Sequence, residues 1–318
     1  MAKAPSTTSA PPLWLSCKPG AYLKTIKAGA APPFLCIMTL QIGRIDYLNM
    51  WHIFHLLAKI CPEGPDFHYV PGHPSKLNRD LAIGELDISP SSSFEYLLHA
   101  ENYELLPGAS ISAREEVQSV LFLSPAPPKE LPAWLARNPG PVCLTAASAT
   151  STALLKVLWS QKWGLPEPQW ETVEPGSGLS TGRPFLEIGN LALRHFVHPP
   201  AGYHIFDLAT EWSNWTGLPF VFAVWIVRRC LPAPTRALLA LLQEHIGAIT
   251  AELDSHFETL SRLPERPTWL TSPDLLRYWR AMSYGLGPEE QASLALFGEH
   301  CTSQGLLPGM PGLRWFTG

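Results

Sequence analysis

Short apolar runs alternate along the chain with segments whose apolar residues recur at helical spacing. The short runs are typical of buried strands, and the clearest lie at residues 39–45, 66–72, 117–124 and 219–229. Helices are predicted at residues 51–60, 75–83 and 94–100. Residues 141–164 and 185–196 each combine a strand with a following helix. This alternation predicts an α/β fold with mostly parallel sheets.

The two ends of the chain differ from this pattern. From about Arg236 onward it predicts helices, with Ser272 and Gly287, each before a proline, as N-caps. The first 37 residues are rich in Pro, Ala, Ser and Thr, and periodicity begins after Met38. Residues 1–38 are therefore predicted to be a disordered extension. Their apolar stretch "PPLWLSC" is too short for a signal peptide, so we expect a cytoplasmic protein.

Composition narrows the kinds of ligand. Hydrophobic residues make up 46% of the chain, charged residues 16%, and the net charge is −4. No basic stripe with interleaved aromatic residues occurs, which argues against nucleic acid or a membrane as the partner. The six cysteines have no CxxC spacing, and the pairs His52/His55 and His195/His198 lack an HExxH motif. We therefore expect no metal site, and no motif indicates an obligate protein partner.

Polar turns follow the predicted strands and precede helices. Asn49 stands at one, three serines at residues 91–93 form a second, and hydroxyl residues gather at 145–152 in a third. If these turns meet at one edge of a sheet, their hydroxyl and N–H groups suit a ligand that bears carboxylates. The alternative is ordinary helix capping at each turn. For Ser119, inside an apolar strand, the pattern alone favours a small core residue.

Several motifs together resemble one family, the menaquinone biosynthesis family MqnA, which comprises the chorismate dehydratases of the futalosine route. The motifs are "GRIDYLN", "PSKLNRDLAIGELDISPSSSFEY", "LLPGASIS", "VQSVLFLS", "SATS" and "EWSNWTGLPFVFAVW". The likeness runs from about Leu40 to the C-terminus. It implies a two-lobed fold like that of type 2 periplasmic binding proteins, with a ligand cleft between the lobes. The first lobe is expected at residues 39–124 plus 225–318, and the second at 125–224.

The resemblance implies a hydro-lyase that removes water from chorismate to give 3-[(1-carboxyvinyl)oxy]benzoate, without a cofactor. The family's catalytic asparagine falls on Asn49 and its catalytic serine on Ser119. Its substrate-binding turns fall on Ser92, Ser93, Ser148, Thr150 and Ser151. No histidine or carboxylate in these motifs offers a general base, so the substrate's own enolpyruvyl carboxylate is the expected proton acceptor.

Two departures from the family pattern stand near these motifs. Met50, Trp51 and His52 follow Asn49 where the family often has a proline, which is expected to alter the cleft mouth or the helix start. Asn190, in "IGN", replaces a usual aspartate. Two other functions fit the same fold: a solute-binding or sensor module, and the later enzyme of the pathway that processes a cyclic futalosine-derived substrate.

Overall fold

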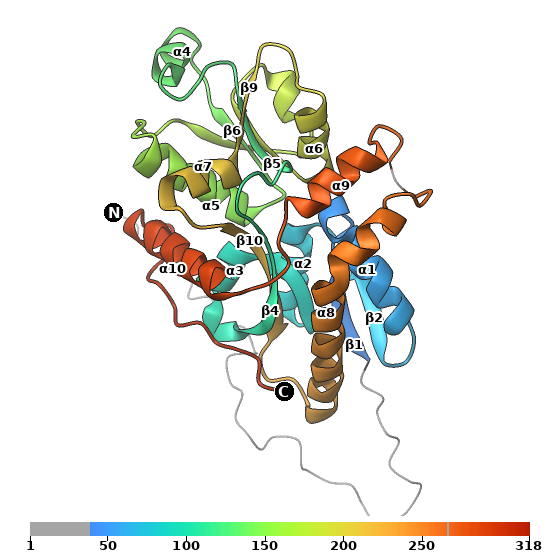
Figure 1. The fold of residues 1–318 in the computed structure, drawn as a ribbon. Helices are drawn as coiled ribbons and strands as arrows, with labels where there is room; N and C mark the ends of the chain where they lie inside the picture. The colour runs from blue at the N-terminus through green and yellow to red at the C-terminus, as the bar shows by residue number, and fades with distance from the viewer. Residues whose placement is uncertain (1–38, 266) are drawn as a thin grey trace, which may run out of the picture. The chain divides into compact units, whose positions relative to one another are not determined.

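Two five-stranded sheets form the framework of the described chain, residues 39–265 and 267–318 of a computed structural model (Figure 1). The extension expected at residues 1–38 lies outside the described residues. In the first sheet the order is β2 (Phe67–Pro71), β1 (Leu40–Arg44), β3 (Ile88–Ser92), β10 (Phe220–Arg228) and β4 (Tyr103–Ala113). In the second it is β7 (Trp170–Val173), β6 (Val142–Thr145), β8 (Phe185–Ile188), β5 (Val120–Ser124) and β9 (His204–Asp207).

Helices connect and cover these strands, which confirms the α/β class. They are α1 (Leu48–Ile60), α2 (Pro74–Ile83), α3 (Ser93–Leu98), α4 (Leu131–Arg137), α5 (Ala149–Val157), α6 (Gly189–Val197), α7 (Leu208–Thr216), α8 (Ala233–Leu260), α9 (Ser272–Arg280) and α10 (Pro288–Ser303). In the described part of the chain no helix is long and apolar enough to cross a membrane.

The sheets are mixed: in each sheet one strand runs against the other four, so the prediction of mostly parallel sheets holds for four of the five strands. β1 runs parallel to β2 and β3, and β6 runs parallel to β7 and β8. β10 and β5 each run antiparallel to both of their neighbours. These two strands are reached by connections that pass from one sheet to the other. A βαβ crossover joins parallel strands of one sheet, but β5 and β10 are each entered from the other sheet and can therefore run antiparallel to their neighbours.

Sheet membership also moves the boundaries expected for the lobes. β5 already belongs to the second sheet, and β10 joins the first sheet from Phe220 onward. The chain therefore passes between the sheets at residues 114–119 and 217–219. The proline-rich residues 124–132 lead from β5 to α4 and do not form a crossing.

The C-terminal segment is helical, as its pattern predicts, and its helices pack mainly on the first lobe. The long helix α8 contacts α1, β1 and β4, and α9 packs on α8 (Figure 1). α10 contacts both β10 and α5, so it touches elements of both lobes. Gly287 precedes α10 as predicted, but the N-cap of α9 is Thr271 rather than Ser272. Thr271 and Asp274 form a reciprocal capping box there.

Candidate active site

A cavity lies between the two lobes, and segments of both sheets line it. The first lobe contributes Ile45, Tyr47, Asn49, Pro74, Ser91, Ser92, Ile111, Phe222 and Ala223. The second contributes Ser119, Val120, Ser148, Ser151, Ile188 and Gly189. The space between these side chains, its open mouth included, is about 510 Å³. Of the described residues that line it, none carries a charged side chain.

Helix N-termini meet at this cavity. Tyr47 and Asn49 flank the first residue of α1, Pro74 begins α2, and Ser148 is the N-cap of α5. Gly189 is the first residue of α6. The first turn of a helix presents unpaired N–H groups and the positive end of the helix dipole. An uncharged wall built in this way favours an anionic ligand.

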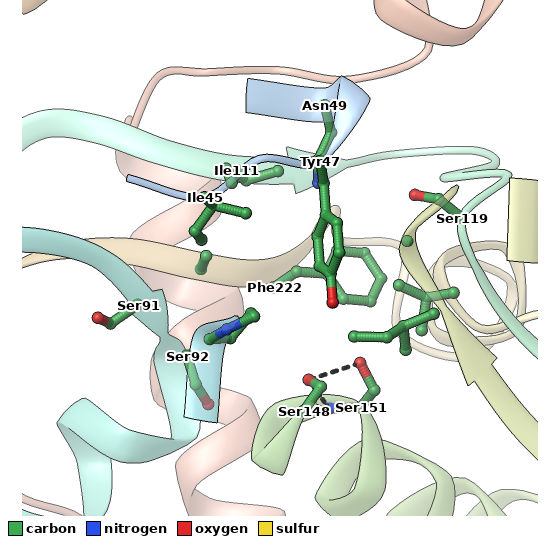
Figure 2. A pocket seen from close by; sticks show the side chains of 15 residues that line it. Ile45, Tyr47, Asn49, Ser91, Ser92, Ile111, Ser119, Ser148, Ser151 and Phe222 are labelled. Atoms are coloured by element: carbon green, nitrogen blue, oxygen red, sulfur yellow. Dashed lines mark hydrogen bonds between the residues drawn. The ribbon is translucent and has the colours of Figure 1, made fainter. Parts of the chain in front are cut away.

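Asn49 and Tyr47 enter the cavity from the start of α1 (Figure 2). The Oδ1 atom of Asn49 is buried and has no hydrogen-bond partner among the described residues. A buried polar atom without a partner is unusual, and a ligand that donates a hydrogen bond satisfies it. Asn49 does not cap its own helix, because it is the second residue of α1, after the N-cap Tyr47, and its Oδ1 accepts no backbone N–H. Its placement fits contact with a ligand.

Tyr47 was not among the residues expected from the sequence, although it belongs to the "DYLN" motif. In Figure 2 its hydroxyl points into the space above Ser148 and Ser151. Burial, and to a lesser degree the charge of Glu187, raises the pKa of Tyr47 to about 12. The hydroxyl therefore stays protonated at neutral pH and can donate a hydrogen bond to a ligand.

Ser119 faces the cavity from a loop that a buried carboxylate holds. The backbone N–H groups of Val117 and Gln118 donate to the Oδ1 and Oδ2 atoms of Asp207 at 3.1 and 2.7 Å. Gln118 has a φ of 57°, a left-handed conformation that costs energy in a residue other than glycine. Burial raises the pKa of Asp207 to about 6, and hydrogen bonds from four backbone N–H groups oppose this rise. Asp207 thus fixes the backbone that presents Ser119.

The Ser119 hydroxyl itself donates to the Val117 carbonyl at 3.2 Å. Behind it lies the fully buried Tyr278 of α9, whose pKa burial raises, so its hydroxyl is also protonated. The core alternative considered for Ser119 is half right. The residue is buried, yet it also lines the cavity.

The expected substrate-binding residues divide into two groups. Ser92, Ser148 and Ser151 line the cavity, and the hydroxyls of Ser148 and Ser151 are 3.0 Å apart (Figure 2). Ser93 and Thr150 do not line it. Thr150 Oγ1 is hydrogen-bonded to Ser92 Oγ at 2.6 Å and accepts the backbone N–H of Phe94 at 3.0 Å.

Thr150 therefore joins the second lobe to the first beneath the cavity. Ser93 also takes part, because its Oγ lies 3.3 Å from Thr150 Oγ1 and donates to the Val221 carbonyl at 2.7 Å. The structure brings both residues to the site but uses their hydroxyls between protein segments. Ser91, the first of the three serines in the turn at residues 91–93, is not among the residues that the family resemblance marks, yet it lines the cavity with a buried hydroxyl that has no partner in the described chain.

The three residues after Asn49 that differ from the family pattern lie away from the cavity. Met50 and His52 are completely buried, and Trp51 stacks on Trp279 with ring centroids 6.1 Å apart. Trp51 and His52 pack α1 against Trp279 of α9, and none of the three side chains lines the cavity. Within residues 39–265 and 267–318, no group of three or more His, Cys, Asp or Glu is placed to hold a metal ion.

Two α/β lobes around a central cavity define a protein with the periplasmic-binding-protein-like fold. The alkanesulfonate-binding protein SsuA from Xanthomonas axonopodis pv. citri is similar, with a TM-score of 0.59 and 14% identity over 85% of this chain and 94% of that one. The aliphatic sulphonate binding protein SsuA from Escherichia coli has a TM-score of 0.52 and 13% identity, over 88% and 94%. At these identities the likeness concerns the fold alone.

The chain belongs to the menaquinone biosynthesis family, whose sequence profile matches residues 40–303. It is 36% identical over 219 residues to the chorismate dehydratase of Thermus thermophilus, which covers 64% of this chain and 74% of that protein. It is 33% identical over 184 residues to the chorismate dehydratase of Campylobacter jejuni, which covers 57% and 64%. The resemblance read from the motifs is confirmed.

Proposed function

We propose that this protein is a chorismate dehydratase, which converts chorismate into 3-[(1-carboxyvinyl)oxy]benzoate and water. The observation that carries the proposal is the character of the cavity, found in a chain that belongs to the menaquinone biosynthesis family. None of the cavity's described lining residues is charged, yet helix N-termini and hydroxyl groups surround it. Chorismate has two carboxylates, and such groups bind at helix N-termini through backbone N–H and hydroxyl donors.

The reaction is an elimination that makes the ring aromatic. The ring carbon that carries the enolpyruvyl ether loses a proton, and the C–H electron pair becomes a ring double bond. The adjacent ring carbon loses its hydroxyl with the C–O electron pair, and the hydroxide leaves as water after taking up a proton. Because aromatisation drives the step, the protein has to orient the substrate and stabilise the leaving hydroxyl.

No side chain of the described lining is placed to act as a strong base. Tyr47 is its titratable group, and the pKa of about 12 keeps it protonated. The nearby carboxylates already accept other hydrogen bonds. Asp207 accepts the backbone N–H groups of residues 117 and 118, and Glu187 accepts those of Gly176 and Ile188. The enolpyruvyl carboxylate of chorismate therefore remains the proton acceptor in this proposal.

Named roles follow from where each side chain lies. Asn49 and Ser119 hold the substrate from opposite lobes and assist the departing hydroxyl. Ser148 and Ser151 bind a carboxylate at the start of α5, where Ser148 Oγ already accepts the Ser151 N–H at 3.1 Å. Tyr47 donates a further hydrogen bond. Ser92, together with Thr150 and Ser93, sets the distance between the lobes.

Turnover of chorismate by the purified protein tests the proposal, with products separated by chromatography and identified by mass spectrometry. The proposal expects an aromatic enolpyruvyl ether that is lighter than chorismate by one water. Chorismate that stabilises the protein against heat but stays unchanged would indicate a solute-binding module. Stabilisation by a futalosine-type compound and not by chorismate would indicate the later enzyme of the pathway.

The proposal places this reaction in the cytoplasm, where a biosynthetic enzyme meets its substrate, with the small molecule chorismate as the partner. It requires neither nucleic acid nor a membrane. The described residues contain no candidate membrane span, and the family relationship points to biosynthesis.

A further inference from the structure

The turn at residues 188–190 contacts Ser119 directly and binds the residue just before Asn49, and the proposed function assigns the chemistry to Ser119 and Asn49. This turn connects β8 to α6 in the second lobe. The backbone N–H of Gly189 donates to the Ser119 carbonyl at 2.8 Å. The Oδ1 atom of Asn190 accepts the backbone N–H of Leu48, next to Asn49, at 3.0 Å. One short turn therefore contacts the Ser119 loop of its own lobe and the start of α1 in the other lobe.

The start of α1 depends on this contact. Its N-cap residue, Tyr47, makes no side-chain cap hydrogen bond, and the first turn has no acidic residue. The N–H groups of Met50 and Trp51 both donate to the Tyr47 carbonyl at 2.9 Å. The N–H of Leu48 has Asn190 as its acceptor. Asn190 thus caps α1 from the opposite lobe, the role that an Asn, Asp, Ser or Thr at the N-cap usually has.

Gly189 adds a packing contact to the hydrogen bond. It has a φ of 65°, and a Cβ atom built on it would lie 3.1 Å from two atoms of the Tyr47 ring. The ring therefore lies against a backbone that has no side chain. Together, Gly189 and Asn190 fix the position of residues 47–49.

We propose that Asn190 is a positioning residue, which holds the first turn of α1, and with it Asn49 and Tyr47, in register with Ser119. The inference rests on the proposed function for its kinetic consequence. The contact joins the two lobes, so it forms only when they are apposed as they are in this structure. Asn190 is half-buried and does not itself line the cavity. Its removal therefore affects the reaction through the positions of Asn49 and Tyr47 and removes no side chain that lines the cavity.

Steady-state kinetics with chorismate and amide hydrogen exchange of the α1 start test this inference. Asn190→Ala should lower kcat on the order of tenfold, with a smaller change in KM, and should speed exchange of the Leu48 amide. Asn190→Leu, similar in size but without an acceptor, should behave in the same way. Asn190→Asp keeps an acceptor and should restore kcat to within about threefold of the wild type, because a cap aspartate serves as well as asparagine.

Asn138→Ala is the matched control, because Asn138 also bonds a helix end in the second lobe, through the Trp134 carbonyl at 2.9 Å. It should leave kcat and Leu48 exchange unchanged. An active wild type with unchanged kcat in Asn190→Ala and Asn190→Leu would overturn the inference, as would unchanged exchange at Leu48. If the wild type converts no chorismate, the proposed function fails. Because exchange needs no substrate, it then decides separately whether Asn190 holds α1.

Discussion

His52 is completely buried one turn beyond Asn49, and replacing it with phenylalanine should make the fold less sensitive to acid. Its ring lies among three aromatic side chains, with centroid distances of 5.4 Å to Phe257, 4.9 Å to Trp279 and 4.9 Å to Tyr284. Burial lowers the pKa of His52 from 6.5 to about 3, and the Leu48 carbonyl opposes this only in part. The folded protein therefore holds a neutral imidazole.

The size of the effect follows from proton linkage. A depressed histidine pKa stabilises the fold fully above pH 6.5, and this stabilisation is lost as pH falls below that value, because the unfolded chain then binds a proton that the folded chain refuses. Each pH unit below 6.5 costs about 1.4 kcal/mol. Between roughly pH 7.5 and pH 5, His52 should therefore remove about 2 kcal/mol from the free energy of unfolding.

Urea unfolding of the wild type and His52→Phe at these two pH values measures this difference. The gap between the two proteins should shift by about 2 kcal/mol in favour of the variant at the lower pH. Both proteins carry Asp207, with its pKa of about 6, so its own pH dependence cancels. His55→Phe, on the same helix at a partly exposed position, should give a much smaller shift. An equal pH dependence of wild type and His52→Phe would refute the reasoning.

Three further predictions concern the cavity. Tyr47→Phe should lower kcat/KM about tenfold, because the variant loses one hydrogen bond to the substrate. The rate of the wild type should stay level from roughly pH 7 to pH 9.5, because the Tyr47 pKa is about 12. Initial rates across this pH range check both expectations. Thr150→Val leaves the Phe94 N–H without its acceptor, and urea unfolding should show a loss of about 1–3 kcal/mol. Gly189→Ala should lower kcat more than Gly182→Ala in the same rate assay. Both glycines have φ near 65°, but a Cβ meets the Tyr47 ring only at Gly189, so equal effects would contradict the packing argument.

The sequence predicted residues that line the cavity better than the contacts that hold those residues in place. The sequence pattern placed polar turns where strands give way to helices, and the family resemblance assigned site roles within them. Of the residues so marked, four line the cavity: Asn49, Ser92, Ser148 and Ser151. Tyr47 belongs to the motif "GRIDYLN", but a tyrosine in a turn has no distinctive pattern that marks it as a site residue.

The contacts that position the site residues join segments that are distant in the sequence, and the sequence did not predict them. The acceptor that Asn190 offers to Leu48 and the carboxylate that Asp207 offers to the Ser119 loop depend on the tertiary arrangement. No local spacing of residues encodes either contact.

β4, like β7 and β9, is not among the strands that the sequence pattern predicts, and for β4 the reason is local. β4 contains Pro107 and Gly108, which interrupt its alternating pattern, and Gly108 has a φ of 74°. The pairing of β4 with β10 accordingly shows register shifts. The mixed strand directions were also hidden, because the pattern of a buried strand is the same in either direction.

The central claim is that Asn49 acts directly on chorismate in a cavity whose described lining carries no charged side chain. Its most direct test compares the single-turnover rate of chorismate dehydration by the wild type and by Asn49→Ala. Chorismate binding to each protein is measured separately, through the rise in melting temperature that the ligand causes. The account predicts that Asn49→Ala still binds chorismate but converts it on the order of a hundredfold more slowly. A variant that converts chorismate at the wild-type rate would contradict the account.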